Sequence, residues 1–114
     1  MMDYPQTDHR ITAGEAIDMT ERFRDNCPPG MALSETFTLA AVRELLSFPG
    51  AAYLRAYYGM KDENSIHAIL VVADAGGNDL LPAEGLAADD DPPVLEDGFR
   101  CPDFCPPDSP LAGA

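Results

Sequence analysis

The sequence predicts an α+β fold, in which two helices pack on an antiparallel β-hairpin or short meander and an irregular Pro/Asp-rich arm follows. Two segments before residue 50 carry apolar side chains at helical spacing, and residues 51–81 hold two strand-like runs around a polar turn. Seven of the 11 prolines lie in residues 82–114. We therefore expect a flexible leader (1–10), a small α+β domain (11–81) and an acidic, proline-rich arm (82–114) partly packed on the sheet.

Two helices are predicted from their end signals. Thr12 with Glu15 three residues later forms a capping box, and the proline-rich segment 26–30 ends that helix. Thr38 is the expected N-cap of the second helix, which Pro49 and the following glycine terminate. Each helix has one apolar stripe, which we interpret as core and not as a cofactor site.

The hairpin has two unlike faces. If Tyr58 lies opposite Ile66, side chains of even number share an apolar face that would receive the two helices. That face comprises Leu54, Ala56, Tyr58, Ile66, Ala68, Leu70 and Val72. The other face is half apolar and is the candidate interaction surface, with Tyr53, Arg55, Tyr57, His67, Ile69 and Val71.

Some segment or partner must cover part of this second face. The candidates are the C-terminal tail, a third strand at Leu80 and Leu81, or another copy of the protein. A two-stranded sheet also has open edges, so a partner can add a strand to it. The turn at residues 74–79 has the glycines and oxygens of a calcium loop but lacks its spacing, which favours an ordinary turn.

Charge narrows the classes of partner. The chain has 20 acidic and 7 basic residues, a net charge of −13, and the acidic excess is greatest after residue 74. Such a field repels phosphate, which argues against nucleic acid and anionic membranes and favours a protein partner or a homo-oligomer. No apolar run reaches the roughly 18 residues of a membrane span, and no signal peptide is recognisable, so we expect a cytoplasmic protein.

Three cysteines allow two kinds of site. Cys27, Cys101 and Cys105, completed by His67 or His9, meet the ligand count of a zinc site. Alternatively, a turn at Pro102 and Asp103 brings Cys101 and Cys105 close enough for a disulfide, which would be a structural or a redox-active bond. Ordinary packing of three small side chains is the third interpretation.

Four short motifs together resemble a group of small bacterial proteins of unknown function. The motifs are a helix ending in Pro-Gly (49–50), a Tyr-Tyr-Gly strand (54–59), an Asp-x-Gly-Gly-Asn-Asp turn (74–79) and a Cys-Pro-x-x-Cys-Pro-like segment (101–106). The resemblance spans about residues 38–107 and implies that the hairpin and the cysteine segment form one unit. It implies no activity.

Catalytic motifs are not recognisable in the sequence. Neither histidine lies beside a nucleophile in a known pattern, and no carboxylate pair has a spacing that indicates glycoside chemistry. We therefore expect a protein that is not an enzyme, a protein-interaction or self-assembly module. The alternative is a small metal-binding or thiol-redox protein that uses the three cysteines.

Overall fold

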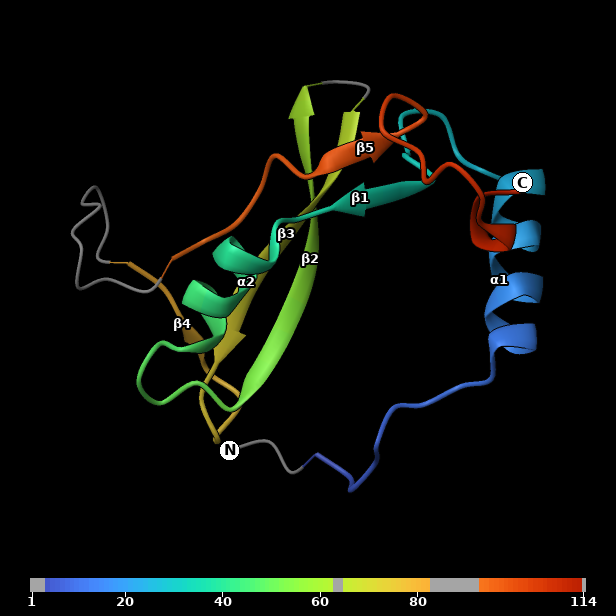
Figure 1. Cartoon of the computed structure of the whole chain (residues 1–114). Helices are drawn as coiled ribbons and strands as arrows, with labels where there is room; N and C mark the ends of the chain where they lie inside the picture. The colour runs from blue at the N-terminus through green and yellow to red at the C-terminus, as the bar shows by residue number, and fades with distance from the viewer. Residues whose placement is uncertain (1–3, 63–64, 83–92, 114) are drawn as a thin grey trace.

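A computed structural model describes residues 4–62, 65–82 and 93–113 (Figure 1). It confirms the α+β class, with two α-helices and antiparallel sheets of three and two strands. In chain order the elements are α1 (Ala13–Asp25), β1 (Ser34–Thr36), α2 (Leu39–Leu46), β2 (Tyr53–Asp62), β3 (Ser65–Ala73), β4 (Asp79–Leu80), β5 (Phe99–Cys101) and the 3₁₀ turn η1 (Pro110–Ala112).

Both helices begin where their caps predict. The Thr12 hydroxyl accepts from the Glu15 N–H at 3.0 Å, and the Glu15 carboxylate accepts from the Thr12 N–H at 3.1 Å. At the start of α2 the Thr38 hydroxyl accepts from the Ala41 N–H at 3.2 Å. The helices pack differently, however: α2 lies against β3, whereas α1 lies beside η1, away from the main sheet (Figure 1). Arg24 of α1 donates to the Leu111 carbonyl at 2.9 Å.

The main sheet has the order β2-β3-β4 and an unexpected register. Tyr58 lies opposite Ala68, two residues from the predicted partner, because the strands continue to Asp62 and Ser65 with an irregularity near the turn. Side chains alternate with a period of two, so a two-residue shift leaves each residue on its predicted face. The apolar pattern therefore identified the faces but had no power to choose between these registers.

A second sheet joins β1 to β5, with Ser34 opposite Cys101. The sequence predicts an irregular arm where β5 forms and no strand where β1 forms. Each strand has three residues, too short for an alternating pattern to be recognised, and the partners are more than sixty residues apart in sequence. Gly98 precedes β5 and allows close packing, since a Cβ there would lie 2.9 Å from the Phe37 ring.

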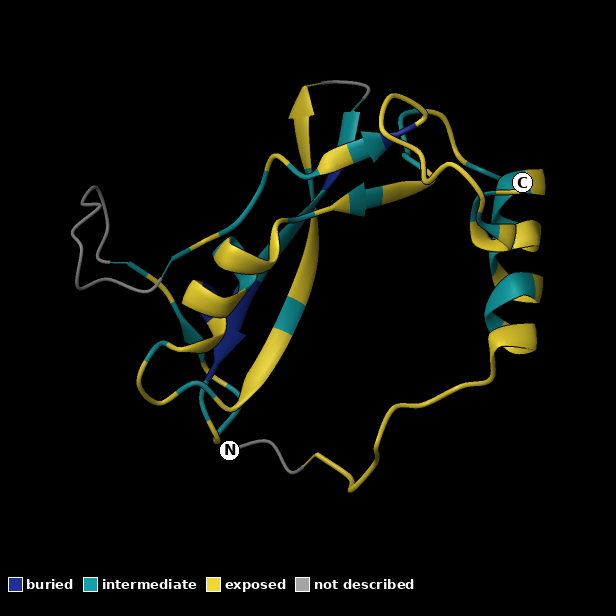
Figure 2. Ribbon diagram, in the orientation of Figure 1, coloured by how far each residue is buried: buried dark blue, intermediate teal, exposed yellow. Residues whose placement is uncertain are grey.

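Most of the core lies at the C-terminal end of β3, with a separate buried residue at the end of β5 (Figure 2). The buried apolar residues are Leu45, Val71, Val72, Ala73 and Cys101. The predicted structural face is divided: its members on β3 are buried or half-buried, but those on β2 are exposed. The helices therefore do not cover the whole face, because α1 packs elsewhere.

The arm returns along the sheet after residue 92. Leu95 exchanges two backbone hydrogen bonds with Leu70, at 2.8 and 3.0 Å, and β5 then pairs with β1. The acidic run at residues 89–91 lies outside the described residues, as does the tip of the hairpin turn. Within the described ranges, no helix is long and apolar enough to cross a membrane.

Candidate interaction site

The outer edge of β3 is covered by several segments in turn. The Ile66 N–H donates to the Gly30 carbonyl at 2.8 Å, and the Ala68 N–H donates to the Glu35 carboxylate at 2.8 Å. Leu70 pairs with Leu95. Beyond this point, β4 completes the edge. The amides on the outer edge of β3 are thus hydrogen-bonded by segments that precede the hairpin in the sequence and by segments that follow it.

The outer edge of β2 differs, because β2 is the terminal strand of its sheet in the described chain. In an antiparallel ladder, two residues that lie opposite one another either both direct their N–H and C=O groups toward the other strand or both direct them away from it. The β2 residues opposite the outward residues of β3 therefore turn their N–H and C=O groups away from the sheet. We call these four residues the β2 edge: Leu54, Ala56, Tyr58 and Met60.

The β2 edge is also apolar and exposed. Leu54, Tyr58 and Met60 have 51, 73 and 64% of their surface accessible, and Ala56 is exposed too. A long, apolar strand edge is a template for pairing with another strand, which most proteins shield. The structure therefore combines unpaired backbone groups and apolar side chains on one strand.

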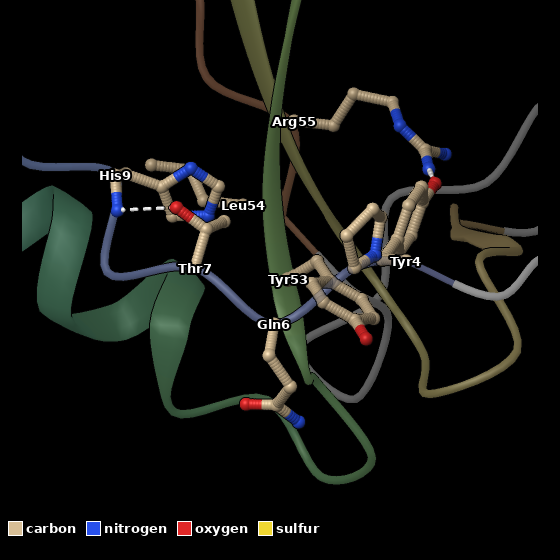
Figure 3. Close-up of a pocket in the computed structure, with 8 residues that line it drawn as sticks. Tyr4, Gln6, Thr7, His9, Tyr53, Leu54 and Arg55 are labelled. Carbon is tan, nitrogen blue, oxygen red and sulfur yellow. Dashed lines mark hydrogen bonds between the residues drawn. The ribbon is translucent and has the colours of Figure 1, made fainter.

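The leader shields only one end of this edge. Residues 4–9 cross β2, with Tyr4 on the side of Arg55 and His9 on the side of Leu54 (Figure 3). The Tyr4 ring lies edge-on to Tyr53 with centroids 4.7 Å apart. A cavity of about 360 Å³ remains between leader and strand. Ala56, Tyr58 and Met60 lie beyond the crossing, and no segment in the described ranges pairs with their outward backbone groups.

On the second face, the three predicted interaction residues of β2, which are Tyr53, Arg55 and Tyr57, already contact other parts of the chain. Arg55 binds the Asp79 carboxylate at 2.5 Å and also donates to the Tyr4 hydroxyl, while Tyr57 donates to Asp79. The Tyr57 hydrogen bond and the Arg55 guanidinium lower the pKa of Asp79. The same Asp79 hydrogen bonds raise the pKa values of Arg55 and Tyr57. This cluster fastens β4 to β2, and nothing in the sequence had indicated Asp79 or Tyr4.

The remaining predicted residues of that face are unsuited to direct contact with a partner. His67 and Val71 are only 7 and 2% exposed, and Ile69 is half-buried. β3 is the central strand of its sheet, so its side chains are covered more fully than those of β2. Of the two hairpin strands, β2 is the one whose large apolar side chains are exposed.

His67 belongs to a polar row that fixes the arm to the sheet. Its Nε2 lies 2.5 Å from the Ser65 hydroxyl, and its Nδ1 lies 3.2 Å from Glu96. Glu96 also binds Lys61 at 3.1 Å, and Lys61 binds Asp97. The Lys61 hydrogen bond is the main cause of the lowered pKa of Asp97. The order serine, histidine, carboxylate is that of a catalytic triad, but Glu96 is shared with Lys61 and we interpret the row as an attachment of the arm.

The cysteines form a disulfide and one free thiol. A turn brings the Cα atoms of Cys101 and Cys105 to 4.6 Å, and the two residues are bonded, whereas Cys27 is free and half-buried. Bonded sulfurs have no thiolate to offer a metal. Among the described residues, no group of three or more His, Cys, Asp or Glu can hold a metal ion, so the predicted zinc ligands are not assembled.

The turn after β3 is likewise closed by its own side chain. Asp74 accepts from the N–H groups of Gly76 and Asn78 at 3.0 and 2.9 Å. The hydrogen bond from the backbone N–H of Asn78 is the leading cause of the lowered pKa of Asp74. A calcium loop would direct such oxygens at the ion, so this geometry is that of an ordinary turn.

Comparison with known proteins assigns no function to this site. No known protein family matches the chain, and no curated protein or solved structure is similar to it. The resemblance to small bacterial proteins stays a prediction. The functional argument therefore depends on the β2 edge and its surroundings.

Proposed function

We propose that this protein is a non-catalytic, cytoplasmic interaction module that accepts an extended strand along the β2 edge. The observation that carries the proposal is the contrast between exposed, outward-facing residues on β2 and the covered edge of β3. In such strand addition, main-chain hydrogen bonds supply affinity and alternate side chains supply specificity.

Edge-blocking substitutions test this proposal. Ala56→Pro removes an outward N–H without taking a hydrogen bond from the ladder with β3. Met60→Lys places a charge on the edge, which disfavours pairing. The matched control is Met19→Lys, because Met19 is an equally exposed methionine on α1 at 57% accessibility.

Wild-type and variant proteins are compared for self-association and for the partner proteins that they retain when immobilised. Each retained partner is then purified and its affinity is measured by calorimetric titration. We expect both edge variants to weaken association by about tenfold or more, equivalent to at least ~1.4 kcal/mol. Met19→Lys should leave it unchanged. Equal association of all four proteins would contradict the use of the β2 edge.

The claim that the protein is not an enzyme is tested separately, at Ser65. A serine-directed fluorophosphonate labels nucleophilic serines that a histidine activates. We expect no labelling of Ser65 in the folded protein. Labelling that His67→Asn abolishes would show that the Ser65–His67–Glu96 row is catalytic and would refute the proposal.

A thiol-redox function is the second candidate, and the disulfide between Cys101 and Cys105 favours it. Cytoplasmic disulfides are uncommon and are often redox-sensing or catalytic. A thiol count in denaturant should find one reactive thiol, from Cys27, and two more after reduction. Titration against glutathione buffers would then locate the reduction potential; a potential far below that of the cytoplasm would exclude reversible redox function there.

A further inference from the structure

We infer that the strand accepted by the β2 edge is β2 of a second copy of this chain. This inference rests on the proposed strand-accepting function and names its partner. Antiparallel pairing of β2 with its own copy about a two-fold axis makes an isologous interface. The resulting continuous sheet has the order β4-β3-β2-β2-β3-β4.

The leader determines the favoured register. Three outward residues lie beyond its crossing, and an axis through Tyr58 uses all of them. Ala56 then pairs with Met60 of the second copy, and Tyr58 pairs with its own counterpart. Since each such pair exchanges two hydrogen bonds, the interface gains about six. An axis through Tyr57 also requires Leu54, where the leader lies, and an axis through Gly59 retains only about four bonds.

Side chains on both faces are compatible with this register. On one face it covers Tyr58 and Met60, the most exposed apolar residues of β2. On the other face, Tyr57 of each copy lies opposite Gly59 of the other. A Cβ at Gly59 would lie 2.8 Å from Ile69 Cδ1, so the sheet itself requires glycine here. Because Gly59 has no side chain of its own, the opposing Tyr57 meets at this position only the Ile69 side chain that covers the glycine.

Charge favours a second copy over a basic segment. Residues 53–60 carry no acidic side chain, and the nearby carboxylates of Asp79, Glu96 and Asp97 are already bonded to Arg55 or Lys61. In the Tyr58 register, Arg55 and Lys61 of opposite copies face each other, each accompanied by its carboxylates. The net charge of −13 opposes association, but salt screens it over about 8 Å at physiological ionic strength. Self-pairing should therefore strengthen with salt, whereas binding of a basic segment would weaken.

Single-cysteine cross-linking tests partner and register together. In a Cys27→Ser background that keeps the disulfide, we compare Tyr58→Cys, Tyr57→Cys and Met60→Cys under mild oxidation. Residues in a hydrogen-bonded pair have Cα atoms about 5.5 Å apart, within disulfide reach. We expect Tyr58→Cys to form a covalent dimer at least about tenfold faster than the other two variants. Light scattering of the wild type should show a dimer fraction that grows from about 50 to about 500 mM NaCl.

The other outcomes refute distinct statements. Fastest cross-linking at Tyr57→Cys would overturn the Tyr58 register and place the axis on Tyr57. A monomeric wild type with no cross-linking at any of the three positions would overturn self-pairing. In that case, a heterologous partner whose binding Ala56→Pro abolishes would leave the strand-accepting function intact. If Ala56→Pro altered no association at all, both the inference and the proposed function would fail.

Discussion

The two strands of the hairpin are neighbours with opposite outer edges. β3 is covered on its outer edge by residues 30–35, by β4 and by Leu95, and it carries most of the core. β2 is longer and exposes its apolar side chains, and of the segments that the structure describes only the leader crosses its outer edge, at one end. The difference teaches that, within the described residues, the segments that pair their backbone with the hairpin from outside do so along the edge of β3. An edge left uncovered beside one so thoroughly covered is a strong candidate for intermolecular pairing.

Amide exchange should give the largest contrast between these strands. In dilute solution, the outward amides of Ala56, Tyr58 and Met60 should exchange nearly as fast as in an unfolded chain. The inward amide of Tyr57 and the covered amide of Ala68 should exchange about a thousandfold or more slowly, equivalent to ~4 kcal/mol. Hydrogen exchange with NMR detection measures each amide. Equal protection of both groups in the monomer would contradict the open edge, and protection that appears only at high concentration would support the dimer.

A pair of truncations should separate the strands by stability. Val72 is fully buried and lies directly opposite Leu54, which is 51% exposed. Val72→Ala should lower the free energy of unfolding by about 2 to 3 kcal/mol, because it leaves a cavity in the core. Leu54→Ala should cost less than about 1 kcal/mol. Urea denaturation measures both, and similar losses would show that the two strands are equally packed.

The Glu35 side chain tests whether cover on β3 contributes to stability. Its carboxylate accepts the Ala68 N–H, and the side chain is 12% exposed. Glu35→Ala leaves that amide without an acceptor and should cost about 1 to 2 kcal/mol. Glu35→Gln retains an accepting oxygen and should recover most of the loss in urea denaturation. If both variants were as stable as the wild type, water would satisfy this edge equally well.

The smallest effect concerns the attachment of β4 to β2. Because the pKa of Asp79 is lowered in the folded protein, its contribution to stability is present above its unfolded pKa, about 4. That contribution disappears as the pH falls through the lower, folded value. Wild type should therefore exceed Asp79→Asn in stability at pH 7 by less than about 1 kcal/mol and lose that advantage in acid.

Thermal unfolding of both proteins across this pH range gives the comparison. Tyr57→Phe removes the hydroxyl that is the leading cause of the shift, so it should reduce the pH-dependent difference. A wild-type advantage that persisted unchanged below pH 3 would contradict the ionised Asp79 cluster.

Local interactions made part of this architecture predictable. The Thr12–Glu15 capping box needs only three residues of separation, and Pro49 with Gly50 ends the second helix by its own backbone restrictions. The two faces of the hairpin followed from the alternation of side chains. The Cys101–Cys105 bond was one of the open alternatives, because a single turn decides whether residues four apart can meet.

The exposure of the predicted interaction surface could not be read from the sequence, for a physical reason. Sequence alternation assigned Tyr57 and Val71 to one face correctly, yet Val71 is buried and Tyr57 is bound to Asp79. Which residues of a face are covered depends on segments that return from far along the chain, such as Glu96 and β4. No local pattern in β2 or β3 records those contacts.

The sequence by itself determined the α+β class, the helix caps, the two faces of the hairpin and the acidic character of the chain. These features depend on side-chain periodicity, backbone restrictions and charge, which act over a few residues or by simple summation. Tertiary structure alone decided the two-residue register shift, the second sheet and the covering of β3 but not β2. Each is a choice among arrangements with similar local energies, and only contacts between distant segments distinguish them.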